Sequence, residues 1–70
     1  MPELTINGEL RVFQAEEFPQ TLMGLLVVLD IVPATIVAEH NEEIVPRDNF
    51  ESEALSSGDK LELVQFVGGG

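Results

Sequence analysis

The chain has 70 residues, a formal net charge of −10 and no cysteine. This length allows one domain with a small hydrophobic core. The negative charge disfavours binding to nucleic acid or to an anionic membrane, because both repel an acidic protein. Without cysteine the chain forms no disulfide and carries no sulfur on a side-chain thiol.

Neither a targeting segment nor a membrane span is recognisable. Residues 1–3 are Met-Pro-Glu, which is unlike the basic start of a signal peptide. The longest uninterrupted apolar run, residues 25–29, is far shorter than a membrane-spanning helix. We therefore expect a single cytoplasmic domain over residues 1–70, with no nucleic-acid or membrane partner.

A β-hairpin is predicted at the start of the chain. Residues 4–6 and 9–13 flank the pair Asn7-Gly8, which favours a type I′ turn because both central residues need positive φ. Apolar side chains alternate with polar ones in both strands. This alternation predicts one buried face, made by Leu4, Ile6, Leu10 and Val12.

A helix is predicted after the polar connector of residues 14–20. Thr21 can cap its first turn, and Asp30 and Pro33 bracket its end. The helical spacing of four leucines predicts a stripe that packs across a sheet: Leu22, Leu25, Leu26 and Leu29. Three further apolar side chains are interpreted as a broad core contact, the alternative being a surface for self-association: Met23, Val27 and Val28.

The second half of the chain is predicted to add three strands. Residues 35–39 form a short one, with Ile36 and Ala38 facing the core and Val37 beside Glu39. Residues 44–45 form a brief one that Pro46 stops. A helical turn near residues 49–53, capped by Asp48, carries Phe50 and Leu55 over the core, and the last strand covers residues 60–67. Five strands and one helix in this order predict an α+β fold.

One group of titratable residues could indicate a metal or acid–base site: Glu39, His40, Glu42 and Glu43. Carboxylates around a single histidine in a tight turn are more often solvated, and a metal site needs ligands that converge. The other acids are scattered, and no nucleophile stands beside a base. We therefore predict no catalytic residue and no metal ligand, and interpret the chain as a carrier or binding module.

The last strand and the residues after it carry the most distinctive pattern. Leu61 and Leu63 alternate with Glu62 and so face the core, which sends Val64 and Phe66 to the opposite face. We interpret this pair as a partner-facing patch, the alternative being that strand twist or the hairpin covers Phe66. Residues 68–70 are glycines, which predict a flexible tail that can enter a narrow passage and end in an unhindered carboxylate.

Several segments together resemble the ThiS family of ubiquitin-like sulfur carriers for thiamin biosynthesis. They are residues 41–47 (Asn-Glu-Glu-Ile-Val-Pro-Arg), Leu55, and residues 58–70, which end in Phe-Val-Gly-Gly-Gly. A Gly-Gly end alone is shared with other ubiquitin-like proteins, but this combination is far more specific, and the resemblance extends over effectively the whole chain. It implies a β-grasp fold, a mixed sheet of four or five strands with one main helix packed across it.

The resemblance also implies a mechanism. An E1-like adenylyltransferase of the ThiF type would join the Gly70 carboxylate to AMP from ATP, with Mg²⁺ bound by that enzyme rather than by the carrier. A persulfide-bearing enzyme would then supply sulfur to give a thiocarboxylate on Gly70. A thiazole synthase of the ThiG type would use that sulfur to build thiazole phosphate.

The same resemblance assigns roles to individual residues. Gly68 and Gly69 would thread the partners' active sites, and three apolar side chains would dock against those partners: Val64, Phe66 and Val67. Arg47 could pair with an acidic group of the partner, but a salt bridge within this acidic chain is the favoured interpretation.

Three other functions remain open from the sequence. One is sulfur transfer for molybdopterin or for tRNA thiolation, although the paired prolines associated with the end of the molybdopterin carrier are missing. Another is a protein modifier conjugated through Gly70. The third is a noncovalent interaction domain with an incidental tail.

Overall fold

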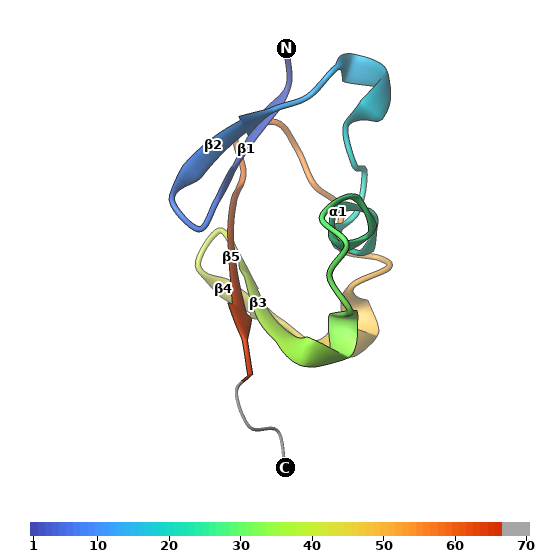
Figure 1. Cartoon of the computed structure of the whole chain (residues 1–70), viewed down its shortest axis with the longest axis vertical. Coiled ribbons are helices and arrows are strands. Elements are labelled where there is room, and N and C mark those ends of the chain that lie inside the picture. The colour runs from blue at the N-terminus through green and yellow to red at the C-terminus, as the bar shows by residue number, and fades with distance from the viewer. Residues whose placement is uncertain (67–70) are drawn as a thin grey trace.

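A mixed five-stranded sheet with one α-helix on one face forms the part of the chain that the structure describes, residues 1–66 of a computed structural model (Figure 1). The strands and the helix are β1 (Glu3–Ile6), β2 (Glu9–Val12), α1 (Leu22–Val28), β3 (Ile36–His40), β4 (Glu43–Val45) and β5 (Lys60–Gln65). The 3-10 turns are η1 (Ala15–Glu17), η2 (Pro33–Thr35) and η3 (Arg47–Asn49). The strand order is β2-β1-β5-β3-β4, with β1 and β5 parallel and the other neighbours antiparallel. The predicted fold class and order of elements are confirmed.

The first hairpin has the predicted turn but not the predicted buried face. Asn7 and Gly8 have φ values of 51° and 83°, as a type I′ turn requires. A two-residue turn pairs Leu4 with Arg11, so Leu10 and Val12 lie on the face opposite Leu4. Leu10 is 60% exposed and Val12 is also exposed. The prediction that Leu10 and Val12 are buried is wrong. The two-residue turn pairs even-numbered residues of β1 with odd-numbered residues of β2, so Leu10 and Val12 lie on the face of Thr5 and not on that of Leu4.

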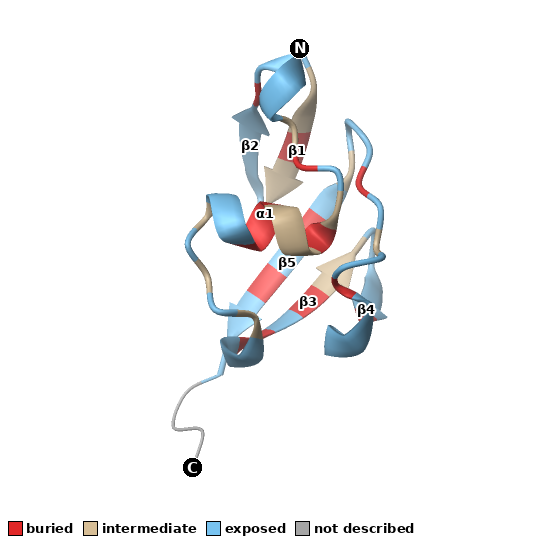
Figure 2. Cartoon of the chain, turned by 90° about the vertical axis from the view of Figure 1, so that its right-hand side faces the viewer, coloured by how far each residue is buried: buried red, intermediate tan, exposed pale blue. Residues whose placement is uncertain are grey.

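The helix α1 begins and packs as predicted. The hydroxyl of Thr21 accepts a hydrogen bond of 3.1 Å from the backbone N–H of Gly24. The buried side of α1 faces the sheet and consists of Leu22, Leu25 and Leu26, with Leu29 partly buried (Figure 2). The first helical N–H groups donate to carbonyls of the segment between β4 and β5, which ties the helix start to that segment.

The predicted core contact of Met23, Val27 and Val28 is confirmed for Met23 only. Met23 is partly buried and packs against the core, but Val27 is 73% exposed and Val28 is also exposed. The helix has seven residues, so only one side of two turns meets the sheet, and Val27 and Val28 project away from it.

The segment between β4 and β5 closes the core. Phe50 and Leu55 are buried, as predicted. Its 3-10 turn η3 begins directly after Pro46 and has no side-chain cap, so the predicted capping by Asp48 and the predicted position of the turn are wrong. Proline fixes a φ that suits the start of a turn, and this one therefore starts earlier in the chain. No helix among residues 1–66 is long and apolar enough to cross a membrane.

We predict different stability effects for two neighbouring helix residues. Leu26→Ala should lower the free energy of unfolding by about 2–5 kcal/mol, because Leu26 is fully buried and its truncation leaves a cavity. Val27→Ala is the matched control and should change it by less than about 0.5 kcal/mol. Denaturant unfolding of both variants measures the difference, and equal losses would contradict this description of the helix.

Candidate functional site

The central strand β5 leads to the residues for which a function was predicted. It lies between β1 and β3. Along it Leu61 and Leu63 are buried, whereas Val64 is 59% exposed and Phe66 is 56% exposed. The predicted outward orientation of Val64 and Phe66 is confirmed, and the alternative in which Phe66 is covered is wrong. The strand ends at Gln65, not at residue 67, and the N–H of Phe66 still donates to the carbonyl of Thr35 at 2.9 Å.

Four exposed apolar side chains lie together on the sheet face away from α1; we call them the outer patch: Val37, Ile44, Val64 and Phe66. Val64 pairs directly with Val37 across β5 and β3, so their side chains are neighbours on that face. Val37, Ile44 and Phe66 line one shallow hollow of about 370 Å³. The patch is therefore continuous across β5, β3 and β4, and it reaches the end of the described chain.

Arg47 belongs to the same region. It lines the hollow with Phe66 and is exposed to solvent. Within residues 1–66 it forms no ion pair, so the internal salt bridge that the sequence favoured is not found there. The structure thus brings Arg47 to the outer patch, where its guanidinium is accessible to a partner. Val67, Gly68, Gly69 and Gly70 lie outside the described residues, and their roles stay predictions.

His40 contacts two carboxylates that are distant in the sequence, and not the neighbouring Glu39, Glu42 or Glu43. His40 Nδ1 lies 2.6 Å from Glu53 Oε2, and His40 Nε2 lies 2.7 Å from Asp59 Oδ2. Glu39 points to the opposite face of the sheet, where it is the cross-strand neighbour of Glu62 in the register of β3 and β5. Both ring nitrogens are engaged, and His40 links the segment between β4 and β5 to the start of β5.

The pKa values of His40 and Asp59 are shifted by their surroundings. Partial burial opposes the charged form of His40, but the hydrogen bonds and charges of Glu53 and Asp59 outweigh it and raise the pKa of His40. Partial burial also opposes the charged form of Asp59. Hydrogen bonds from the Ser56 N–H, His40 and Asn41 outweigh that effect and lower the pKa of Asp59. Protonated His40 therefore links Glu53 to Asp59, and we call these three residues the His40 clamp.

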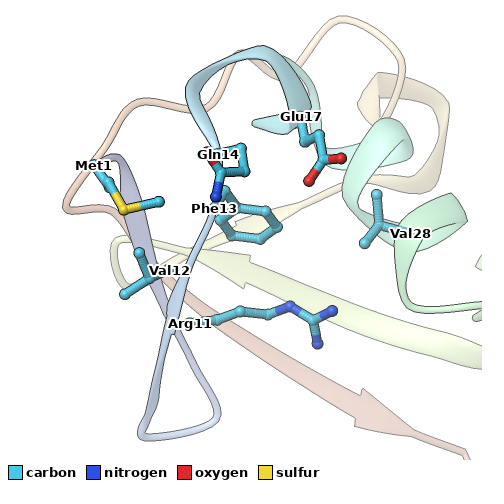
Figure 3. Close-up of a pocket in the computed structure, with 7 residues that line it drawn as sticks. All are labelled: Met1, Arg11, Val12, Phe13, Gln14, Glu17 and Val28. Atoms are coloured by element: carbon cyan, nitrogen blue, oxygen red, sulfur yellow. The ribbon is translucent and has the colours of Figure 1, made fainter.

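Other polar groups on the described surface do not converge. Among residues 1–66 no three His, Asp or Glu side chains are placed to hold a metal ion. A hollow of about 620 Å³ lies between β2, η1 and α1, and Arg11, Glu17 and Val28 contribute to its lining (Figure 3). The Arg11 guanidinium lies 5.7 Å from the centre of the Phe13 ring. This hollow is open and lies far from the end of β5, and the charged side chains at it are Arg11 and Glu17.

The predicted orientation of Val37, away from the core-facing Ile36 and Ala38, is confirmed. Sequence reasoning did not join Val37 to Val64 and Phe66 in one patch, and it missed Ile44. Ile44 pairs with Glu39 of β3, and this pairing, which places it on the outer face, depends on the turn between β3 and β4.

Comparison with known proteins agrees with the fold. The model of the ThiS family matches residues 4–70. The chain belongs to the ThiS family. A crystal structure of the thiamine biosynthesis protein ThiS from Geobacter metallireducens superposes with a TM-score of 0.80 at 30% identity, covering 97% of this chain and 99% of that one.

Two related sequences extend this ThiS-family comparison. The sulfur carrier protein ThiS of Bacillus subtilis is 32% identical over 50 residues, which is 71% of this chain and 76% of that protein. A thiazole synthase of Paramagnetospirillum magneticum is 43% identical over 68 residues. That match covers 97% of this chain, which spans only 20% of the length of that relative.

The His40 clamp predicts a specific dependence of stability on pH. The raised pKa of His40 means that protonated His40 stabilises the fold fully below its ordinary pKa of 6.5. This contribution is lost as the pH rises through the higher pKa of the folded state. The free energy of unfolding should therefore fall between neutral and mildly alkaline pH, as measured by urea unfolding. His40→Gln removes the only histidine and should flatten this fall; an unchanged slope would contradict the clamp.

Proposed function

We propose that this chain is a sulfur carrier for thiamin biosynthesis, and that sulfur is carried as a thiocarboxylate on Gly70. The observation that carries the proposal is the continuity of the outer patch with the glycine tail. Phe66 is exposed in that patch, and the sequence continues from it through Val67 to three glycines. Membership of the ThiS family supports the same function.

In this proposal the outer patch is the docking surface for the activating enzyme. Burying apolar side chains on both partners stabilises the complex by about 25 cal/mol per Å² of apolar surface removed from water. Four exposed side chains make a small area, which suits a carrier that must leave after each turnover. Arg47 would pair with an acidic group beside this surface, while the net charge of −10 would steer the chain toward a partner with basic flanks.

The tail supplies the reacting atoms. A carboxylate is a poor electrophile, so an adenylyltransferase of the ThiF type would activate it with ATP and Mg²⁺. A Gly70 carboxylate oxygen attacks the α-phosphorus of ATP, and pyrophosphate leaves. The terminal sulfur of an enzyme-bound persulfide then attacks the acyl carbon, and AMP leaves. A thiol reduces the resulting acyl disulfide, which releases the thiocarboxylate.

A thiazole synthase of the ThiG type would be the acceptor of this sulfur. Two relatives named thiazole synthase contain a region similar to 97% of this chain. Having both regions in one chain raises the effective concentration of carrier at the synthase, which supports the proposal that the two proteins work together. Gly68 and Gly69 would let the tail thread both active sites, because no Cβ obstructs a narrow passage.

In this proposal the chain acts as a carrier and not as a catalyst. Among residues 1–66, the one histidine is engaged on both ring nitrogens, and no nucleophile stands beside a base. The chemistry would therefore be performed by the partner enzymes, and the carrier would contribute recognition and the terminal carboxylate.

Intact-mass spectrometry tests this proposal. Incubation with the adenylyltransferase, ATP, Mg²⁺ and a persulfide donor should give a mass gain equal to the replacement of one oxygen by one sulfur. Omission of the donor should leave an adenylate. A chain without Gly69 and Gly70 is the control and should gain neither group. Absence of both products with partners that activate another ThiS-family carrier would refute the proposal.

A further inference from the structure

The strand β5 extends well beyond its neighbour β1. Thr5 pairs with Lys60 and Ile6 with Leu61, and β1 then ends. On the other side β3 accompanies β5 as far as Gln65. The second half of β5, which leads to the tail, therefore has a strand on only one side.

The side chain of Asn7 occupies the position where the next residue of β1 would be. Its Oδ1 accepts a hydrogen bond of 2.7 Å from the N–H of Leu63, and its Nδ2 donates one of 3.2 Å to the carbonyl of Leu63. The backbone N–H of Asn7 also donates to the carbonyl of Leu61 at 2.9 Å. One asparagine side chain thus satisfies both backbone groups of Leu63, which in a longer parallel pairing would bond to two different residues of β1.

The turn makes this arrangement possible. Asn7 has a φ of 51°, in the left-handed region that the type I′ turn requires. Asparagine tolerates this φ better than most residues and has an amide that both donates and accepts. The turn preference explains an asparagine at this position but not its two bonds to a strand 56 residues away.

We propose that Asn7 is a positioning residue that fixes the second half of β5, and so the point from which the tail enters the partner's active site. This inference rests on the proposed function of Gly70. Beyond Leu63, none of the described residues pairs with β5 on the β1 side. Without the Asn7 amide, residues 62–66 are held only on the side of β3 and Thr35 and can pivot about that pairing. Misplacing a reacting group by about 1 Å can lower a rate roughly 100-fold.

The chain contains a matched control for this inference. Asn41 begins the other two-residue turn and has the same φ of 51°. Its side chain also makes two hydrogen bonds, accepting from the N–H of Lys60 at 2.9 Å and donating to Asp59 at 3.3 Å. These bonds hold the first residue of β5, far from the tail. In both asparagines the side-chain oxygen accepts from a backbone N–H of β5, at Lys60 for Asn41 and at Leu63 for Asn7.

The experiment compares Asn7→Gly with Asn41→Gly, because glycine keeps the positive φ and removes both side-chain bonds. Adenylation by the ThiF-type enzyme is followed through pyrophosphate release, at a temperature where circular dichroism shows both variants folded. Asn7→Gly should lower kcat/KM roughly tenfold, and Asn41→Gly less than about twofold. Asn7→Asp keeps the acceptor for the Leu63 N–H but not the donor, so it should recover part of the loss.

Amide hydrogen exchange provides a second readout independent of the enzyme. Exchange at Leu63 should become faster in Asn7→Gly and stay unchanged in Asn41→Gly, where Lys60 should be affected instead. If Asn7→Gly does not fold, Asn7→Asp takes its place in both measurements. Equal kcat/KM losses in the two variants, or no loss in either, would overturn the positioning role while leaving the proposed function intact. An unaltered chain that is never adenylated would overturn both.

Discussion

The register of β5 against β1 and β3 determines both the core and the exposed sheet face. Its inner residues, Leu61 and Leu63, fill the centre of the core beneath α1. Its outer residues, Val64 and Phe66, form half of the outer patch. A strand has two faces with a period of two, so one register sets both the core and the surface. A shift of one residue would bury Val64 and expose Leu63, removing the core contact and the patch together.

Side chains outside the strands help to hold that register. Asp59 accepts from the N–H of Ser56 and from His40 at the start of β5, and Asn41 holds Lys60 beside it. Asn7 acts further along, at Leu63. Each is polar, partly exposed and placed in a turn or at a strand end, where backbone groups would otherwise lack partners. A domain this small has few core residues, so such bonds form an important share of what orders β5.

Most of the fold could be predicted from local patterns. The Asn7-Gly8 turn, the Thr21 cap and the leucine stripe of α1 depend on neighbours in sequence, and all three were predicted correctly. The errors at Leu10 and Val12 arose where two strands had to be combined, because the turn length decides which residues share a face. The errors at Val27 and Val28 arose because composition does not tell how much of a helix the sheet covers.

The candidate site was predictable only in part. The exposure of Val64 and Phe66 follows from alternation within one strand. The position of Arg47 beside Phe66, the partners of His40 and the bonds from Asn7 to Leu63 join segments far apart in the chain. Such contacts depend on the whole topology. The glycines of residues 68–70 could be recognised from the sequence because the threading role proposed for them requires only the absence of side chains, which the sequence itself shows.

Binding of the activating enzyme by the outer patch is tested by the affinities of two variants with a side chain truncated to alanine. Phe66 and Leu10 are both exposed apolar residues, but Leu10 lies on β2, outside the patch. Phe66→Ala should weaken binding to the ThiF-type enzyme by at least roughly tenfold, and Leu10→Ala by less than about twofold, in calorimetric titrations with both variants folded. Equal affinities for the two variants would contradict the claim.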